Sequence, residues 1–390
     1  MRVLQFFKTY YPDSYGGTEQ VIFQLSQAIS AIGVETDVLA LSGNPARGPA
    51  SIGNHRTHYA KRDFEIASTG VSFAAIGNFR RLAEDADIVN YHYPWPYMDV
   101  VHFIARAGKP TVLTYHSDII RQKRLRVIYR PLEKIFFNSV DAIVATSPNY
   151  AATSPILQVY RDKLRVIPIG VDERQYPEVS QERRSYWRQR FGERFFLFVG
   201  MLRYYKGLHI LLEAIRGAEY DVLIMGAGPI ERELRAQAEH LKVNNVHFLG
   251  ALPDEDKIAL LDLAAGAVFP SHLRAEAFGI FLLEAAMFAK PLISSEIGTG
   301  TSYVNVDRET GIVVQPGDPS ALRQAMDYIW THPDEAARLG KNARSRYENL
   351  FTAQAMAKAY LSLYRSVLAK RHVDARGNLH VGAKIIGQDH

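Results

Sequence analysis

Residues 266–287 have the sequence GAVFPSHLRAEAFGIFLLEAAM, and no other stretch shows the fold class as clearly. The apolar run Gly266–Phe269 has the length of a buried strand, a polar loop follows it, and an apolar segment of helical length begins near Phe278. Strand, loop and helix in this order form the repeating unit of a parallel, doubly wound sheet. Ligands of such sheets bind at the loops that follow the strands, so we expect the candidate site residues there.

Two glutamates lie eight residues apart in this stretch. Glu276 falls in the loop, and Glu284 falls on the second turn of the predicted helix. Six residues of helix, at ~1.5 Å each, separate them by roughly 9 Å along the axis, which suits contacts to two parts of one extended ligand. Glu284 lies among apolar residues, where a carboxylate needs partners. A buried glutamate satisfied by backbone groups is the alternative.

The same alternation extends over the whole chain. In the first half, strands are predicted at residues 2–7, 34–41, 88–92, 111–115, 142–146 and 164–168. After a charged stretch, strands are predicted at residues 195–199, 221–225, 246–249, 266–269, 291–294 and 311–314. Segments of helical length separate most of these strands. The pattern therefore predicts two α/β domains, each with a doubly wound parallel sheet.

The domain boundaries follow from this pattern. We expect one Rossmann-like domain over residues 1–175 and a second over residues 176–351. A closing helix is expected over residues 352–370, and residues 371–390 form a tail with little periodicity. The loops at the carboxyl ends of both sheets are expected to meet around a shared cleft.

Composition limits the classes of protein. With 390 residues, 47% apolar and 22% charged, the chain is long enough for two or three domains of ordinary globular composition. It has no cysteine, which excludes disulfide scaffolds, thiolate zinc sites and a cysteine nucleophile. No stretch reaches ~18 uninterrupted apolar residues, and the apolar run after Met1 is too short for a signal peptide. We therefore expect an intracellular protein that is soluble or bound to a membrane surface.

Three other loops carry residues suited to an anionic ligand. Gly16 and Gly17 follow the first strand and lead into a helix, whose N-terminus favours an anion. Arg203 and Lys206 follow the first strand of the second half, and two cations in such a loop can clamp a diphosphate. His116 follows a strand at the same edge of the first sheet. A tight turn, solvated surface charge and a structural histidine are the respective alternatives.

These residues together resemble the retaining, two-domain (GT-B) glycosyltransferases of family four, over about residues 1–368. The resemblance rests on Gly16-Gly17, Arg203 with Lys206-Gly207, Gly226-x-Gly228-Pro229, Pro270-Ser271 and Glu276-x7-Glu284. Residues 7–13 and 296–303 look like segments of the mannosyl- or D-rhamnosyltransferases that build bacterial O-polysaccharide. The resemblance implies a GT-B fold of two Rossmann-like domains, the N-terminal one on the acceptor side and the C-terminal one binding the nucleotide sugar. It also implies a C-terminal helix that crosses back to the first domain.

The resemblance also implies roles for the candidate residues. Glu284 would bind the nucleotide ribose, while Arg203 and Lys206 would neutralise the diphosphate. Glu276 would hold the donor hexose and His116 would face its anomeric centre, so these two are the expected catalytic residues. Further donor contacts are expected from Gly16 and Gly17 beside the diphosphate, from the amides of Phe278, Gly279 and Ile280 at the hexose, and from Leu252 and Asp254 at a guanine base.

The chain departs from the family at two positions. Met201 stands where the family places the arginine of its phosphate clamp, so Arg203 is expected to substitute for it. A loop of paired glycines in the family is replaced by Gly298-Thr299-Gly300-Thr301.

No metal and no bound cofactor are expected. Asp85 and Asp87, like Asp254-Glu255-Asp256, have the spacing of metal ligands, but the family needs no metal, and we expect solvated carboxylates. The nucleotide-diphosphate sugar is a co-substrate. Charge on the departing diphosphate would be offset by Lys206, Arg203 and helix-terminal amides. The resemblance implies retention on one face of the donor, without an obligatory protein nucleophile.

The net charge of +5 lies in the first half, where residues 1–170 contain 19 Lys and Arg against 14 Asp and Glu. The basic residues of the segment after His116 are interleaved with apolar ones and include Arg121, Lys123, Arg124, Arg126 and Arg130. Such a segment can lie on an anionic leaflet, and an ordinary helix packed on the core is the alternative. We expect a cytoplasmic protein, peripheral at the inner face of the cytoplasmic membrane, with no nucleic-acid partner.

The sequence therefore predicts a retaining glycosyltransferase that moves mannose or D-rhamnose from a GDP-sugar to a lipid-linked glycan acceptor in bacterial lipopolysaccharide synthesis. A sugar-nucleotide 2-epimerase on a related scaffold is the enzymatic alternative, and it would need no acceptor. The second alternative is a non-catalytic sugar-nucleotide-binding subunit, which would bind the sugar nucleotide without turnover. A dehydrogenase is disfavoured because no dinucleotide fingerprint is present.

Overall fold

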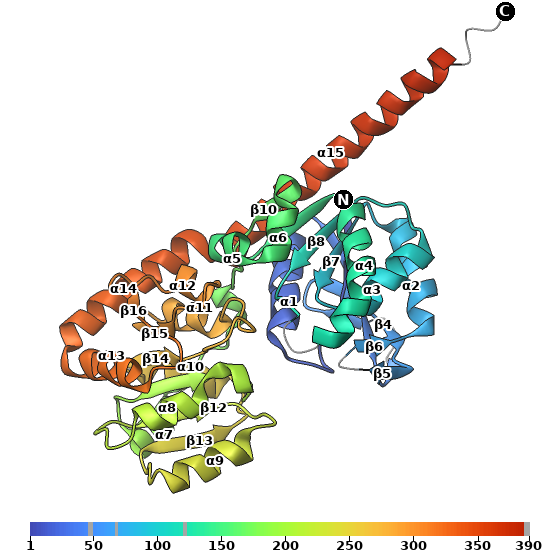
Figure 1. Ribbon diagram of the computed structural model, residues 1–390. Helices are drawn as coiled ribbons and strands as arrows, with labels where there is room; N and C mark the ends of the chain where they lie inside the picture. The colour runs from blue at the N-terminus through green and yellow to red at the C-terminus, as the bar shows by residue number, and fades with distance from the viewer. Residues whose placement is uncertain (46–49, 67–68, 120–122, 386–390) are drawn as a thin grey trace, which may run out of the picture. The chain divides into compact units, whose positions relative to one another are not determined.

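The computed structural model describes residues 1–45, 50–66, 69–119 and 123–385, with residues 123–127, 372 and 374–385 described by backbone alone. The chain divides into two compact units, each built on one sheet (Figure 1). Unit 1 comprises Met1–Ala145, Pro155–Ile167 and Ala353–His390, and unit 2 comprises Thr146–Ser154 and Pro168–Thr352.

The main sheet of unit 1 has eight strands in the order β10-β9-β8-β7-β1-β2-β4-β3, all parallel to their neighbours except β3. The strands are β1 (Arg2–Phe6), β2 (Glu35–Ser42), β3 (Ala50–Ile52), β4 (His55–Lys61), β7 (Ile88–Tyr93), β8 (Thr111–Tyr115), β9 (Ala142–Ala145) and β10 (Leu164–Val166). The helices are α1 (Gly17–Ser30), α2 (Phe73–Asp85), α3 (Pro96–Ala105), α4 (Lys123–Ser139), α6 (Pro155–Val159) and α15 (Ala353–Ile385). The strand order reverses between β1 and β7, which makes the carboxyl ends of these strands the expected ligand edge.

The sheet of unit 2 has six parallel strands in the order β13-β12-β11-β14-β15-β16. The strands are β11 (Phe196–Val199), β12 (Val222–Met225), β13 (Val246–Gly250), β14 (Gly266–Phe269), β15 (Leu292–Ser295) and β16 (Gly311–Val314). The helices are α5 (Pro148–Thr153), α7 (Gln181–Phe191), α8 (Leu208–Ala214), α9 (Glu231–His240), α10 (Asp254–Leu263), α11 (Ile280–Met287), α12 (Thr301–Val304), α13 (Pro319–Thr331) and α14 (Pro333–Leu350). This order reverses between β11 and β14 and is that of a Rossmann fold. The predicted fold class is confirmed.

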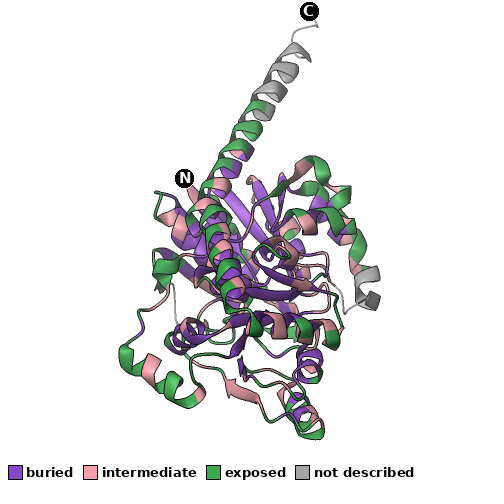
Figure 2. Cartoon of the chain, turned by 90° about the vertical axis from the view of Figure 1, so that its left-hand side faces the viewer, coloured by how far each residue is buried: buried purple, intermediate pink, exposed green. Residues whose placement is uncertain are grey.

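Burial explains why the strands could be predicted. Strands such as β12 and β14 are apolar and buried along their whole length, as both faces of a parallel sheet are covered by helices. Figure 2 shows most strands buried and most helices with one exposed face. The continuous apolar runs in the sequence follow from this arrangement.

Four strands were missing from the prediction. The strand β4 was overlooked because its sequence, HRTHYAK, is mostly polar, although alternate positions such as His55 and Thr57 are buried. The short strand β3 pairs with β4. After β4 in the sequence, β5 (Phe64–Ile66) pairs antiparallel with β6 (Thr69–Val71). Short or polar strands give no strong period-two pattern.

The closing helix is longer than predicted. Its first part packs on unit 1, where Tyr360 and Tyr364 share a buried cluster with Val3 and Leu25. A tail with little periodicity was expected after residue 370. This expectation is corrected, because the helical backbone continues to Ile385. Periodicity reports which residues are buried, and a helix of ordinary propensity without proline can continue beyond its packed part.

Candidate active site

In unit 2, two loops meet at the reversal of strand order. Residues 200–207 follow β11, and residues 270–279 follow β14. Gly207 has a φ of 71°, and a Cβ added there would lie 1.9 Å from the carbonyl oxygen of Pro270. Only glycine allows this approach, so the two loops are held in contact at the carboxyl edge of the sheet.

The predicted residues Lys206 and Glu276 are brought together by these loops. The ammonium of Lys206 donates to Glu276 Oε2, and the side chains are 12% and 11% exposed. Ser271 Oγ lies 3.4 Å from the same oxygen. The ammonium also lies 4.5 Å from the centroid of the Phe269 ring, a cation–π geometry. The ammonium of Lys206 and the carboxylate of Glu276 thus form a largely buried ion pair at the strand ends.

Glu284 has protein partners that the sequence analysis missed. It is buried on α11, and its Oε1 accepts hydrogen bonds from Tyr176 OH at 2.8 Å and from Lys257 Nζ at 2.9 Å. Tyr176 precedes α7 and Lys257 lies on α10, so two segments outside α11 fix this carboxylate. Side chains therefore satisfy this carboxylate where the alternative expected backbone groups, and its contact with a ribose stays a prediction.

Lys257 links Glu284 to another predicted residue. Its ammonium also bonds Asp254 Oδ1 at 2.8 Å. Burial works to lower the pKa of Lys257, but the charges of Glu284 and Asp254 outweigh it and raise the pKa above its ordinary value. Lys257 therefore stays a cation. Asp254 has a lysine as partner, and its expected contact with a guanine edge stays a prediction.

Arg203 does not join the Lys206–Glu276 pair in the structure. Its side chain is exposed, and its Nε donates to Met201 Sδ at 3.0 Å. Met201, which stands where the family places its arginine, is therefore in contact with Arg203, the residue expected to substitute for that arginine. The role of Arg203 at a diphosphate stays a prediction.

The remaining predicted residues of unit 2 lie on neighbouring loops. Phe278, Gly279 and Ile280 form the N-terminal end of α11, and Gly279 is its N-cap with a φ of 86°. The first N–H groups of a helix have no partner within the helix and favour an anion. Leu252 lines a cavity of about 570 Å³ together with Phe248 of β13 and Trp187 of α7.

One acidic group expected in solvent is buried. Asp256 is 3% exposed, accepts a hydrogen bond from Trp187 Nε1 at 2.8 Å and forms an ion pair with Arg183 at 3.1 Å. It therefore ties α10 to α7, which corrects the expectation of a solvated carboxylate. Within the described ranges, no three or more His, Asp or Glu side chains are grouped so as to hold a metal.

In unit 1, the predicted residues lie at the carboxyl edge of the sheet. Gly16 is the N-cap of α1 and Gly17 its first residue, directly after the loop that follows β1. His116 directly follows β8, and its backbone N–H donates to Tyr93 O at 3.0 Å. The imidazole of His116 is buried, and desolvation lowers its pKa to about 3. His116 is therefore a neutral imidazole at pH 7.

A second histidine supports His116. His92 of β7 is fully buried, and its Nδ1 lies 2.9 Å from His116 Nε2, with the two rings stacked at 5.2 Å. Burial lowers the pKa of His92 well below its ordinary value, and His116 acts in the same direction. In the sequence His92 appeared only as part of a predicted strand, and no motif singled it out.

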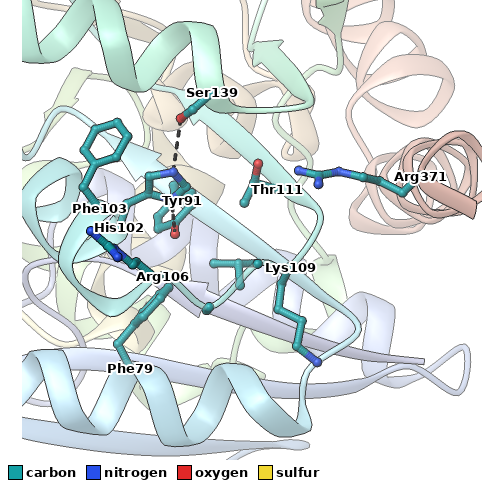
Figure 3. A pocket seen from close by; sticks show the side chains of 12 residues that line it. Phe79, Tyr91, His102, Phe103, Arg106, Lys109, Thr111, Ser139 and Arg371 are labelled. Atoms are coloured by element: carbon teal, nitrogen blue, oxygen red, sulfur yellow. Dashed lines mark hydrogen bonds between the residues drawn. The ribbon is translucent and has the colours of Figure 1, made fainter. Parts of the chain in front are cut away.

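Unit 1 has a cavity at the amino edge of its sheet, opposite the edge where His116 lies. It measures about 450 Å³ and is lined by residues at the amino ends of β7 and β8, by His102 of α3 and by Arg371 of α15 (Figure 3). The polar groups around it are largely paired. Tyr91 OH lies 2.9 Å from His102 Nδ1, and Arg371 bonds Asp141 at 2.8 Å. We assign no ligand to this cavity.

The predicted membrane segment is described only in part. Arg121 lies outside the described residues, as do the side chains of Lys123, Arg124 and Arg126. Arg130 lies on α4 and is exposed. Ile128 on the same helix is 81% exposed. In the part of the chain that the structure describes, no helix is both long and apolar enough to cross a membrane.

Comparisons with known proteins identify the family. Residues 180–346 match the family model "Glycosyl transferases group 1", and residues 15–175 match "Glycosyltransferase Family 4". The chain is 56% identical over 353 residues to D-rhamnosyltransferase WbpZ of Pseudomonas aeruginosa, covering 90% of this chain and 93% of that protein. It is 51% identical over 371 residues to O-antigen chain mannosyltransferase C of Escherichia coli, covering 95% and 100%.

The fold has solved counterparts. Sucrose-phosphate synthase from Thermosynechococcus elongatus superposes with a TM-score of 0.76 at 22% identity, over 95% of this chain and 99% of that chain. Two Rossmann-like sheets in one chain are the GT-B architecture, and the two family models identify a glycosyltransferase. The chain belongs to the group 1 glycosyl transferases, glycosyltransferase family 4, and the predicted resemblance is confirmed.

Proposed function

We propose that this enzyme is a retaining hexosyltransferase that moves mannose or D-rhamnose from a GDP-sugar to a lipid-linked glycan during O-polysaccharide synthesis. Relatives with more than half of their residues identical are a D-rhamnosyltransferase and an O-antigen chain mannosyltransferase. The observation that carries the proposal is the Lys206–Glu276 pair at the strand ends of unit 2, with Glu284 fixed nearby in sequence on α11.

The proposed donor site divides the sugar nucleotide among these groups. Glu284 accepts hydrogen bonds from the ribose hydroxyls, because Lys257 and Tyr176 hold its carboxylate in place. Lys206 offsets the charge that develops on the departing diphosphate, with Arg203 and the N-terminus of α11 as further contributors. Glu276 and the amides of Phe278–Ile280 orient the hexose. The bond from the anomeric carbon to the diphosphate oxygen breaks, and the acceptor oxygen bonds to that carbon on the same face. The proton of the acceptor hydroxyl passes to an oxygen of the departing diphosphate.

In this proposal, no metal ion takes part and no protein nucleophile forms a covalent intermediate. His116 contributes a neutral imidazole toward the hexose. Its lowered pKa of about 3 supports this, since a neutral imidazole can accept a hydrogen bond from a hydroxyl at physiological pH. Undiminished transfer in the presence of excess EDTA is the expected result, and a full loss restored by Mg²⁺ would contradict it.

We further propose that α4 of unit 1 attaches the enzyme to the anionic inner leaflet, where a lipid-linked acceptor would be presented. Exposed Ile128 and Ile135 next to exposed Arg130 and Lys134 support this, because apolar insertion and electrostatic attraction add up. Flotation with vesicles containing anionic lipid tests the proposal. Co-flotation at low salt that is lost in the double variant Ile128→Ser, Ile135→Ser is expected, and no co-flotation of the wild type would refute it.

A transfer assay tests the function itself. The purified enzyme is incubated with labelled GDP-mannose or GDP-D-rhamnose and membranes that contain the lipid-linked acceptor. We expect hexose in the lipid fraction, with an α-anomer product from an α-configured donor. Glu276→Gln should abolish transfer, while Glu133→Gln, a buried glutamate in unit 1 bonded to Tyr93, should retain it. Interconversion of free sugar nucleotides without acceptor would instead indicate the epimerase.

A further inference from the structure

A buried hydrogen-bond chain in unit 1 ends at His116. His116 Nε2 lies 2.9 Å from His92 Nδ1, and His92 Nε2 lies 2.8 Å from Gln5 Oε1. Gln5 comes from β1 and His92 from β7, the two strands that flank the reversal of strand order. Both residues are fully buried, so water does not compete for these bonds.

Further members of this hydrogen-bond chain fix the orientation of Gln5. Asn90 Nδ2 donates to Gln5 Oε1 at 2.8 Å, and Thr114 Oγ1 donates to Asn90 Oδ1 at 3.1 Å. Thr114 Oγ1 lies 2.9 Å from the hydroxyl of Tyr360, which must donate because the threonine proton is already used. The chain thus runs from α15 through three strands to the imidazole of His116.

This order of donors determines the tautomers of both imidazoles. Gln5 Oε1, 2.8 Å from His92 Nε2, can only accept, so His92 carries its proton on Nε2 and its Nδ1 is an acceptor. Asn90 Nδ2 lies 3.4 Å from the same Nε2, and this longer contact does not outweigh the 2.8 Å bond. The bond to His116 therefore requires a proton on His116 Nε2. The lone pair of His116 lies on Nδ1, on the other side of the ring from His92.

We propose that His92 is a positioning residue that holds His116 in the Nε2–H tautomer, with its Nδ1 presented as an acceptor for a substrate hydroxyl. The inference rests on the proposed function, in which His116 faces the reacting sugar. Nothing in the chain needs a charged imidazole, and burial keeps both rings neutral. A ring fixed in one orientation and one tautomer loses no binding energy to reorganisation in the transition state.

Paired variants at position 92 separate positioning from packing. His92→Phe keeps an aromatic ring but removes both bonds. We expect kcat to fall about 10- to 100-fold, the range found for groups that orient a metal-bound imidazole, with the KM for the sugar nucleotide nearly unchanged. His92→Asn can accept from His116 through Oδ1 and should recover part of kcat. His102→Phe is the matched control, because His102 also bonds through both ring nitrogens but lies at the opposite edge of the sheet (Figure 3).

A spectroscopic readout tests the tautomer without reference to activity. In ¹⁵N-labelled wild-type protein, long-range ¹H–¹⁵N correlations should report His116 as Nε2–H, and His92→Phe should give averaged tautomers. A His116 protonated on Nδ1, or equal kcat for the wild type and a folded His92→Phe variant, would overturn the inference. If the wild type transfers no hexose, the proposed function fails, while the nitrogen shifts still decide the tautomer.

Discussion

Lys206 and Glu276 form an ion pair that connects the loop after β11 to the loop after β14, with side chains 12% and 11% exposed. A charge so poorly solvated is tolerated only beside its partner. The pair therefore serves the fold before any ligand is present, and it holds both groups at the strand ends where a sugar nucleotide is proposed to bind.

Removing the cation should affect both stability and catalysis. We expect Lys206→Met to leave Glu276 uncompensated and to cost about 3–5 kcal/mol of unfolding free energy. The kcat should also fall by about 10²- to 10³-fold, because the charge on the leaving diphosphate loses its main offset. Urea denaturation and steady-state transfer rates measure the two effects.

A double variant separates these two roles. Lys206→Met combined with Glu276→Leu has no unpaired charge, so its unfolding free energy should return toward the wild-type value. Its activity should not return. Recovery of transfer in the double variant would show that the pair acts only through stability.

The hydroxyl of Tyr176 should contribute to nucleotide affinity. It donates to the buried Glu284, and hydrogen bonds to charged groups contribute about 1.5–3 kcal/mol. We expect Tyr176→Phe to weaken GDP binding by about tenfold or more in isothermal titration. Tyr220→Phe is the matched control, because Tyr220 donates to Asp327 at the same distance of 2.8 Å but on a different part of unit 2. Equal affinities for the two variants would exclude this role.

Buried histidines make the stability dependent on pH. Burial lowers the pKa of His55 to about 4, below the value of the unfolded chain. The unfolded chain therefore binds the proton at the higher pH, and the stability that this residue contributes is present above about pH 6.5 and is lost as the pH falls. In urea denaturation between pH 6.5 and 5, wild type should lose about 1.4 kcal/mol per pH unit more than His55→Phe. Parallel curves would contradict this.

The closing helix should be essential to unit 1. Tyr364 of α15 is fully buried in the same cluster as Val3 and Leu25, and truncating a large aromatic in a core costs about 3–5 kcal/mol. We expect Tyr364→Ala to lower the melting temperature strongly and Arg365→Ala, exposed on the next position, to change it little. Equal melting temperatures for the two variants would show that α15 is not part of the core.

The fold was predictable where strands are continuously apolar. Residues 196–199 and 222–225 have no polar side chain, so burial on both faces could be recognised from the sequence alone. The strand His55–Lys61 could not, because buried polar side chains such as His55 have partners that only the tertiary structure supplies.

The motif residues of the candidate site could be predicted from the sequence, but the residues that hydrogen-bond to them could not. The spacing of Glu276 and Glu284 placed both glutamates correctly on the loop and on α11. Tyr176 and Lys257 were missed because they lie far from Glu284 in sequence and resemble surface residues. His92 was missed because a histidine inside an apolar strand carries no sign of its partner at position 116.

The most direct test of the account is nucleotide selectivity. Thermal-shift and calorimetric titrations with GDP, UDP, ADP and CDP would be compared between wild type, Glu284→Ala and Glu133→Gln. A ligand at 100 times its Kd stabilises by about 2.7 kcal/mol. We predict a shift selective for GDP that is lost in Glu284→Ala and kept in Glu133→Gln. A shift that Glu284→Ala retains, or no shift with any of the four nucleotides, would contradict the proposed donor site.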